Sequence, residues 1–225
     1  MTVYLLNPNS SHETTEAMTA IARNEAPGLS ITGLTAPFGP SMIVDEAGLG
    51  TGARAVEAMA RGLTETGDVD AIIVAAFGDP GIAAVRAGLP GLPATGIGEA
   101  SFAEAARDGQ RFAVVTTTPE LVAAIAERVR LAGHSDRFLG TVLTEGDPEA
   151  LLTSCEALEA ALEEACRRAR DDLAAEVIII GGGPLAEAAD ALGRRLSIPI
   201  VAPVRAAARR IVETLSGRGD GGKSG

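Results

Sequence analysis

The sequence predicts an α/β protein with two pseudo-symmetric lobes of alternating strands and helices, parallel sheets, and a site in the cleft between the lobes. Two observations lead to this prediction. Residues 71–77 form an uninterrupted apolar run that ends in Gly-Asp-Pro-Gly and passes directly into an amphipathic segment. A second apolar run, at residues 177–180 directly after Glu176, ends in Gly-Gly-Gly-Pro and also passes into a helical pattern. Such runs are typical of buried parallel strands, and two copies indicate two similar halves.

Each of these units places a glycine-rich turn between a buried strand and a helix. Ligands of open α/β sheets bind beyond the carboxyl ends of the strands, where main-chain N–H groups and helix N-termini carry partial positive charge. Such turns are also common in α/β proteins without any ligand nearby. Because the pattern occurs twice, we expect the two turns to share one site.

The composition narrows the classes of partner. The 225 residues suffice for one large α/β domain or two small ones. A net charge of −11, few aromatic residues and no basic cluster argue against nucleic-acid binding. No apolar run approaches the ~20 residues of a membrane span, and no basic segment precedes an apolar one at the N-terminus. We expect a cytoplasmic protein with a small-molecule substrate and no nucleic-acid or membrane partner; a homo-oligomer is left open.

The first lobe is expected at residues 1–97. A buried strand at 3–6 leads into an Asn-Pro-Asn-Ser-Ser turn, where Ser10 or Ser11 can cap the next helix. The loop at 35–41 contains two prolines and a glycine, which suggests a fixed shape and a lid over the cleft. The other expected elements are helix 12–24, strand 29–34, helix 48–66, strand 69–77, helix 82–88 and strand 94–97.

The pattern restarts near residue 98, which places the second lobe at 98–202. Pro119 follows Thr118 and Pro148 follows Asp147, and a proline directly behind a capping residue is typical of a helix start. A last helix at 204–215 is expected to return to the first lobe, so that residues 203–216 complete it. Residues 217–225 are expected to be disordered, because Gly and polar residues bury little apolar area. The other expected elements are helix 99–107, strand 111–115, helix 119–131, strand 138–143, helix 148–172, strand 176–180, helix 186–192 and strand 199–202.

The two cysteines are expected to be structural. Cys155 and Cys166 both fall in the expected helix 148–172, about 16 Å apart along its axis. A disulfide needs Cα atoms within roughly 7 Å, so the pair cannot form one. Neither has a His or a second Cys at metal-ligand spacing, and we expect neither a metal nor a cofactor. Both thiols are interpreted as small core side chains that cannot reach the cleft.

Several short motifs together resemble a known family. They are Asn7-Pro8-Asn9-Ser10-Ser11 with Met18-Thr19, Phe77-Gly78-Asp79-Pro80-Gly81, Gly98-Glu99-Ala100 and Phe112-Ala113-Val114-Val115-Thr116-Thr117. In this order they resemble the aspartate/glutamate/hydantoin racemase superfamily, most closely its hydantoin and allantoin racemase branch, up to about residue 216. The resemblance implies a cofactor-independent isomerase with two α/β lobes and the active site between them.

The family chemistry that this resemblance implies needs two thiols. One cysteine removes the α-proton of the substrate, and a second, on the opposite lobe, delivers a proton to the other face. The matching positions in this chain are Ala76 and Gly182. Neither can exchange a proton, so two-thiol racemisation is unavailable, whether Ala76 is natural or engineered. If the matching is right, Ala76 and Gly182 face one cavity.

Polar side chains at the expected strand ends can still hold a carboxylate or an imide-like ring. Helix capping and turn formation are the alternative roles of these Asn, Ser and Thr residues. The glycines at 181–183 permit close backbone approach and are a candidate anion hole in place of the lost thiol. The candidate substrate-binding residues are Asn7, Ser10, Ser11, Phe77, Gly78, Thr116, Thr117, Gly181, Gly182 and Gly183, with Thr118 beside them.

Asp79 and Glu99 are the candidate catalytic acids or bases. Asp79 lies in the turn after the long apolar run, but Asp before Pro is also an ordinary turn residue. Glu99 begins a helix, where the helix dipole stabilises a carboxylate without any catalytic role. Asp45 and Glu46 follow the proline-containing loop and could reach the cleft from it. His12 can titrate near neutrality, but a first-turn histidine commonly faces solvent.

Two functions from different classes follow. The first is a racemase-superfamily enzyme that acts on a small carboxylate or a cyclic ureide of the hydantoin or allantoin kind, by a non-thiol isomerase, lyase or hydrolase mechanism. The second is a catalytically inactive ligand-binding or regulatory homologue that kept the pocket. Exchange of solvent deuterium at the α-carbon of a substrate separates them, because exchange requires a working base.

Overall fold

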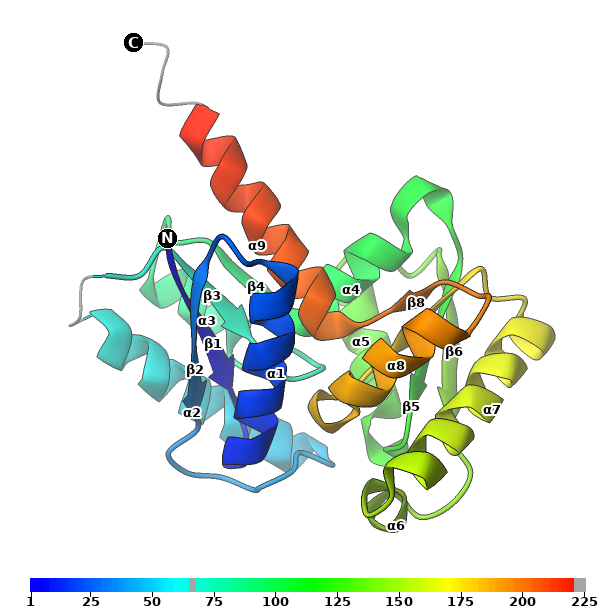
Figure 1. Cartoon of the computed structure of the whole chain (residues 1–225). Helices are drawn as coiled ribbons and strands as arrows, with labels where there is room; N and C mark the ends of the chain where they lie inside the picture. Colours follow the sequence, from blue (N-terminus) through cyan, green and yellow to red (C-terminus); the bar gives the residue numbers. More distant parts are fainter. Residues whose placement is uncertain (65–67, 221–225) are drawn as a thin grey trace.

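The computed structural model describes residues 1–64 and 68–220 and contains two four-stranded parallel sheets flanked by helices (Figure 1). This architecture confirms the predicted α/β class. Residues 65 and 66 of the expected helix 48–66, and residues 221–225 of the expected tail, lie outside the described residues.

The first sheet has the strand order β2-β1-β3-β4. Helix α1 packs on β2 and α9, and α2 packs on α3 and β1. The elements are β1 (Thr2–Asn7), α1 (His12–Glu25), β2 (Ser30–Thr35), α2 (Glu46–Thr64), β3 (Ala71–Val74), α3 (Ile82–Gly88) and β4 (Ala94–Gly96).

The second sheet repeats this arrangement with the order β6-β5-β7-β8. Helix α4 leaves β4 directly and packs over this second sheet through β7 and β8. The elements are α4 (Ile97–Ala105), η1 (Arg107–Gly109), β5 (Phe112–Thr116), η2 (Pro119–Leu121), α5 (Val122–Leu131), β6 (Phe138–Leu143), α6 (Pro148–Leu152), α7 (Cys155–Leu173), β7 (Val177–Ile180), η3 (Gly183–Leu185), α8 (Ala186–Arg195), β8 (Ile200–Val201) and α9 (Pro203–Asp220).

The shared strand order determines where the fold can place a site. In each sheet the first strand, β1 or β5, lies between the second and the third, so the chain winds outward from it in both directions. The register pairs Leu6 with Val74 in the first sheet and Val115 with Ile180 in the second. A crevice opens beyond the carboxyl ends of such a central strand pair. The ends of β1, β3, β5 and β7 are therefore where a ligand is expected.

One apolar core joins the two sheets. Ile73 of β3 and Ile179 of β7 are both fully buried and belong to the same cluster, together with side chains of α1, α4, α5 and α9. Their neighbours Ile72 and Ile178 point to separate outer cores under the flanking helices of each sheet. The strands are therefore buried on both faces, which is why their sequences read as unbroken apolar runs.

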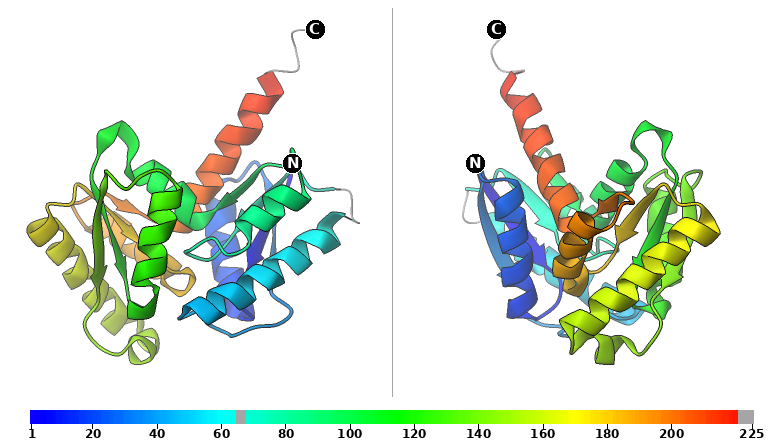
Figure 2. Two further views of the ribbon diagram at one scale, coloured as in Figure 1. Left: turned by 180° about the vertical axis from the view of Figure 1, so that it is seen from behind. Right: turned by 45° about the vertical axis from the view of Figure 1, so that its right-hand side comes forward.

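The C-terminal helix α9 packs against α1 and α4 and extends away from the rest of the molecule (Figure 2). Arg209 pairs with Glu25 of α1 at 2.8 Å and with Glu104 of α4 at 2.7 Å. The contact with α1 agrees with the expected return to the first lobe, while the division into domains 1–97 plus 203–216 and 98–202 stays a prediction. The predicted helix end at residue 215 is wrong, because α9 continues to Asp220.

The expected helix 148–172 is two helices in the structure. Helix α6 ends at Leu152, and Ser154 begins α7 by accepting a hydrogen bond on its Oγ from the N–H of Ala157 at 3.3 Å. Cys155 is therefore the first residue of α7 and is exposed, whereas Cys166 is buried. No helix in the described part of the chain has both the length and the apolar character needed to cross a bilayer.

Candidate functional site

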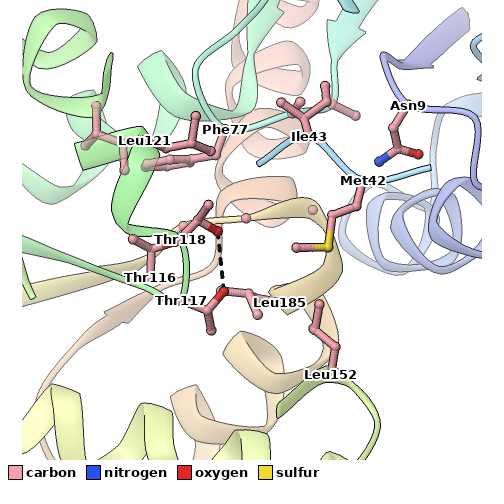
Figure 3. Close-up of a pocket in the computed structure, with 16 residues that line it drawn as sticks. Asn9, Met42, Ile43, Phe77, Thr116, Thr117, Thr118, Leu121, Leu152 and Leu185 are labelled. Carbon is pink, nitrogen blue, oxygen red and sulfur yellow. Dashed lines mark hydrogen bonds between the residues drawn. The ribbon is translucent and has the colours of Figure 1, made fainter. Parts of the chain in front are cut away.

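A pocket lies where the carboxyl ends of β3, β5 and β7 meet between the two sheets (Figure 3). The segments 75–77, 116–118 and 181–183, which directly follow or end these strands, form much of its wall. Its cavity volume is about 40 Å³. The pocket therefore occupies the place that the strand order predicts.

Apolar side chains form the rest of the wall. They come from the loop before α2, from η2, α5 and α6, and from η3, and they are Met42, Ile43, Leu121, Ile125, Leu152 and Leu185. None of the 16 residues that line this pocket is Asp, Glu, His, Cys, Tyr, Lys or Arg. The pocket wall, as far as the structure describes it, thus offers no side chain that changes charge near neutral pH.

The polar groups of the pocket are neutral hydrogen-bonding groups. The hydroxyl oxygens of Thr117 and Thr118 lie 3.5 Å apart at the end of β5. Across the pocket, Asn9 Oδ1 accepts hydrogen bonds from Asn7 Nδ2 at 2.8 Å and from the N–H of Ser11 at 2.9 Å. These bonds orient the Asn9 amide nitrogen toward the pocket (Figure 3). Hydroxyls that can donate or accept therefore face an amide donor.

Ala76 and Gly182 line the same pocket from opposite lobes. The methyl group of Ala76 is nearly buried in the turn after β3. Gly182 has φ +145° and ψ 134°, a conformation that only glycine adopts readily. A Cβ added there would also lie 3.1 Å from Leu185 Cγ. The structure thus brings together the two positions that the resemblance assigns to the family thiols. They differ in backbone conformation, because Gly182 has a positive φ and Ala76 does not.

Phe77 and Gly181 bring the two lobes into direct contact beside the pocket. The Phe77 ring packs edge-on against Phe102 of α4, with the centroids 5.5 Å apart. A Cβ at Gly181 would lie only 2.6 Å from Phe77 Cε1. Glycine at 181 is therefore what lets the ring of the first lobe lie against the backbone of the second.

Asp79 is fully buried, but it does not line the pocket. Its carboxylate accepts hydrogen bonds from the N–H groups of Gly98 at 2.7 Å and Glu99 at 2.8 Å, at the start of α4. Arg128 of α5 lies 3.5 Å away and pairs with it across the lobes. Burial raises the pKa of Asp79 to about 6, against the opposing effect of these N–H donors. Asp79 thus ties the turn after β3 to α4 and α5.

Glu99 is also outside the pocket wall, and its side chain accepts hydrogen bonds at the start of α4. Its Oε1 accepts hydrogen bonds from Thr95 Oγ1 at 3.1 Å and from the N–H of Gly96 at 3.4 Å. Arg86 of α3 forms an ion pair with the same carboxylate. The structure therefore gives both candidate catalytic carboxylates partners at the start of α4. A role at a helix start was the alternative that the sequence left open for Glu99, whereas the alternative for Asp79 was an ordinary turn residue.

The Asn-Pro-Asn-Ser-Ser turn supports the pocket mostly from behind. Asn7 is fully buried and donates to Asn9, so it orients the residue that does line the pocket. Ser10 Oγ donates to the carbonyl oxygen of Gly39 at 3.1 Å and holds the loop before α2. Ser11 caps α1, as predicted. Only Asn9 of this turn is in the pocket wall.

Four other sequence candidates lie outside the pocket wall. Gly78 belongs to the turn that joins Phe77 to Asp79. Asp45 Oδ1 accepts a hydrogen bond from the N–H of Gly48 at 2.7 Å, and Glu46 begins α2. The His12 ring is exposed, and its Nδ1 lies 3.2 Å from a threonine hydroxyl of β2. The loop before α2 instead contributes Met42 and Ile43, which sequence reasoning missed.

A larger groove of about 510 Å³ adjoins the pocket and shares Met42, Leu152 and Gly183 with it. Cys155 lines this groove. The expectation that neither thiol could approach the cleft is therefore wrong for Cys155, because the break at Ser154 places it at a helix start. Cys166 lies in the outer core of the second sheet, where burial raises its pKa to about 12.

The fold agrees with the family whose profile matches most of the sequence. Residues 3–211 match the profile of the Asp/Glu/Hydantoin racemase family, and the chain belongs to this family. A hydantoin racemase from Paenarthrobacter aurescens is 31% identical over 226 residues, which cover 96% of this chain and 91% of that protein.

Solved structures of allantoin racemases are similar along the whole chain. Those from Klebsiella pneumoniae and Pseudomonas fluorescens each have a TM-score of 0.88 at 30% identity. The matches cover 97% of this chain and 89% and 92% of those chains, respectively. These relatives place the chain in the hydantoin and allantoin racemase branch.

Proposed function

We propose that the pocket binds a small cyclic ureide of the hydantoin or allantoin kind and does not racemise it with a pair of thiols. The observation that carries this proposal is the chemistry of the pocket wall. Ala76 and Gly182, which the resemblance matches to the two proton-transferring cysteines, both line the pocket, and among the described residues no ionisable side chain replaces them there. Carbon-acid exchange needs a base within hydrogen-bond reach of the proton. The geometry therefore favours the ligand-binding function over racemisation.

The polar groups of the pocket suit a neutral ring. A cyclic ureide presents N–H donors and carbonyl acceptors in one plane, which the hydroxyls of Thr117 and Thr118 and the amide of Asn9 can match. The apolar walls around Phe77 and Leu121 can cover the faces of the ring. A carboxylate buried there would find no cationic side chain, and burying an unpaired charge is costly. A ureide is therefore the better ligand than a small carboxylate.

Calorimetric titration of the protein with hydantoin and allantoin tests this proposal. We expect saturable binding, and Thr117→Val should weaken it about five- to tenfold, because one buried hydrogen bond contributes about 1 kcal/mol. Thr141→Val is the matched control, since Thr141 lies on β6 outside the pocket wall. The proposal fails if neither compound binds at millimolar concentration, or if the two variants weaken binding equally.

A second candidate is a non-thiol enzyme that uses the same pocket. The chain belongs to a family named after enzymes, the racemases, which supports this candidate. The hydroxyls of Thr116, Thr117 and Thr118 also support it, because they can donate hydrogen bonds to developing negative charge. Such an enzyme would hydrolyse a ring amide: water adds to the carbonyl carbon, the C–N bond breaks with its electron pair staying on nitrogen, and that nitrogen takes a proton from the attacking water, so that no ionisable side chain is required. Proton NMR of allantoin or a hydantoin with catalytic amounts of protein tests it. New product signals above the protein-free rate would favour this candidate over pure binding.

A further inference from the structure

Helices α1, α7 and α8, from both lobes, line the groove beside the pocket. Helix α1 contributes Glu13 and Thr14, with Ser11 as its N-cap; α7 contributes Cys155 at its first position, and α8 contributes Glu187. Because the groove and the pocket share Met42, Leu152 and Gly183, a ligand whose ring lies in the pocket can extend a substituent between these residues into the groove. Its volume of about 510 Å³ is ample for a flexible side arm.

The charge of this groove has one sign. Glu13, Glu159 and Glu187 come from three different helices, and no Lys, Arg or His is among the residues described as lining it. Glu159 is already paired, because Arg195 donates to its Oε2 at 3.0 Å. Glu13 and Glu187 are exposed residues of α1 and α8. The unbalanced charge of the groove therefore comes mainly from Glu13 and Glu187.

These carboxylates do not form a metal site. Among the described residues, no three His, Cys, Asp or Glu side chains lie close enough together to hold a metal ion. The groove instead presents a dispersed negative field over a long cavity. Such a field attracts a mobile cationic group and repels an anionic one without demanding one fixed geometry.

We propose that the groove receives the substituent of the ring-bound ligand and selects a cationic arm over a carboxylate arm, through Glu13 and Glu187. This inference rests on the proposed function, because it assumes that the ring occupies the pocket. It assigns to the ligand a substituent that ends in an ammonium or guanidinium group. It also makes two residues of helices α1 and α8 determinants of specificity, although neither is in the pocket wall.

Three hydantoins that share the ring and differ only in the 5-substituent test this proposal: 4-aminobutyl, butyl and 2-carboxyethyl. By calorimetry we expect the aminobutyl compound to bind about tenfold more tightly than the carboxyethyl compound, with butyl between them. Raising the salt concentration to about 1 M should shrink this ratio severalfold, because exposed charges are then screened beyond about 3 Å.

Variants of Glu13 and Glu187 test whether these residues cause the preference for the cationic substituent. The double substitution of Glu13→Gln and Glu187→Gln should reduce the ratio to near one while butylhydantoin binds as before. Glu213→Gln is the control, since Glu213 is an exposed residue of α9 far from the groove lining. Equal binding of all three compounds by the unaltered protein, or a ratio that survives the double substitution, would overturn the inference and leave the proposed function intact. Failure of all three to bind would overturn the proposed function, and the inference with it.

Discussion

The two turns that face each other across the pocket are built in different ways. Side chains hold the turn after β3: Asp79 binds the start of α4 and pairs with Arg128. The turn after β7 is built from glycine backbone, with Gly181 under the Phe77 ring and Gly182 at φ +145°. The first turn can accept a different small residue at Ala76, whereas the second cannot accept one at Gly182 without moving.

This difference bears on how the chain departs from two-thiol chemistry. At Ala76 one substitution would restore a thiol in an unchanged turn. At Gly182 the backbone itself has a conformation that disfavours any side chain, and a Cβ there would lie 3.1 Å from Leu185 Cγ. Installing both cysteines would therefore require a rebuilt second turn. If Gly182 matches the second family cysteine, as the resemblance implies, the local backbone as well as the residue identity disfavours a thiol there.

The largest expected effect concerns Asp79, which holds the first turn. Its pKa of about 6 in the folded protein lies above its ordinary value of 3.8. Its stabilising contribution is therefore complete below pH 3.8 and is lost as the pH rises through 6. Relative to Asp79→Asn, the wild type should lose up to about 3 kcal/mol of unfolding free energy between pH 4 and pH 7. Urea unfolding of both proteins across this range measures the difference; a constant difference would show that Asp79 does not titrate there.

Gly182→Ala tests the second turn directly. A side chain at this φ is strained and close to Leu185, so we expect a loss of about 2 kcal/mol of unfolding free energy. Ala76→Ser is the matched substitution in the first turn and should cost less than about 1 kcal/mol, because it adds one atom toward the cavity. Equal losses in the two variants would remove the contrast between the turns.

Gly181→Ala is expected to cost less than Gly182→Ala, about 1 kcal/mol of unfolding free energy, because the Phe77 ring must shift to admit the methyl group. A double-mutant cycle with Phe77→Ala isolates this contact. In the Phe77→Ala background the same substitution should cost almost nothing. If the cost is the same in both backgrounds, the strain does not arise from the contact between the two lobes.

Much of the fold could be predicted from the sequence because the signals were local. Unbroken apolar runs such as 71–74 and 177–180 mark strands buried on both faces, and Ser11 and Asp147 mark helix starts. The break between α6 and α7 was missed because the pattern is helical on both sides of Thr153 and Ser154, and only these two residues interrupt it. The capping serine was the available signal, and its neighbour Cys155 was consequently misplaced in the core.

The site was predictable only where it follows strand ends. The turns at 75–77, 116–118 and 181–183 line the pocket because parallel strands bring their carboxyl ends together. The apolar wall was not predictable, since Met42, Leu121 and Leu152 come from loops and short helices whose positions depend on tertiary packing. The role of Asp79 was also hidden, because its N–H partners lie some twenty residues further along the chain.

Proton exchange at the ring carbon tests the central claim, that the pocket binds a ureide without a proton-transferring pair. Single enantiomers of butylhydantoin and allantoin would be incubated in D₂O with saturating protein and followed by proton NMR, with a related hydantoin racemase as the positive control. The account predicts saturable binding while the signal of the ring C–H decays no faster than without protein. Loss of that signal at a rate proportional to protein concentration would contradict it, because it would reveal a working base in the pocket.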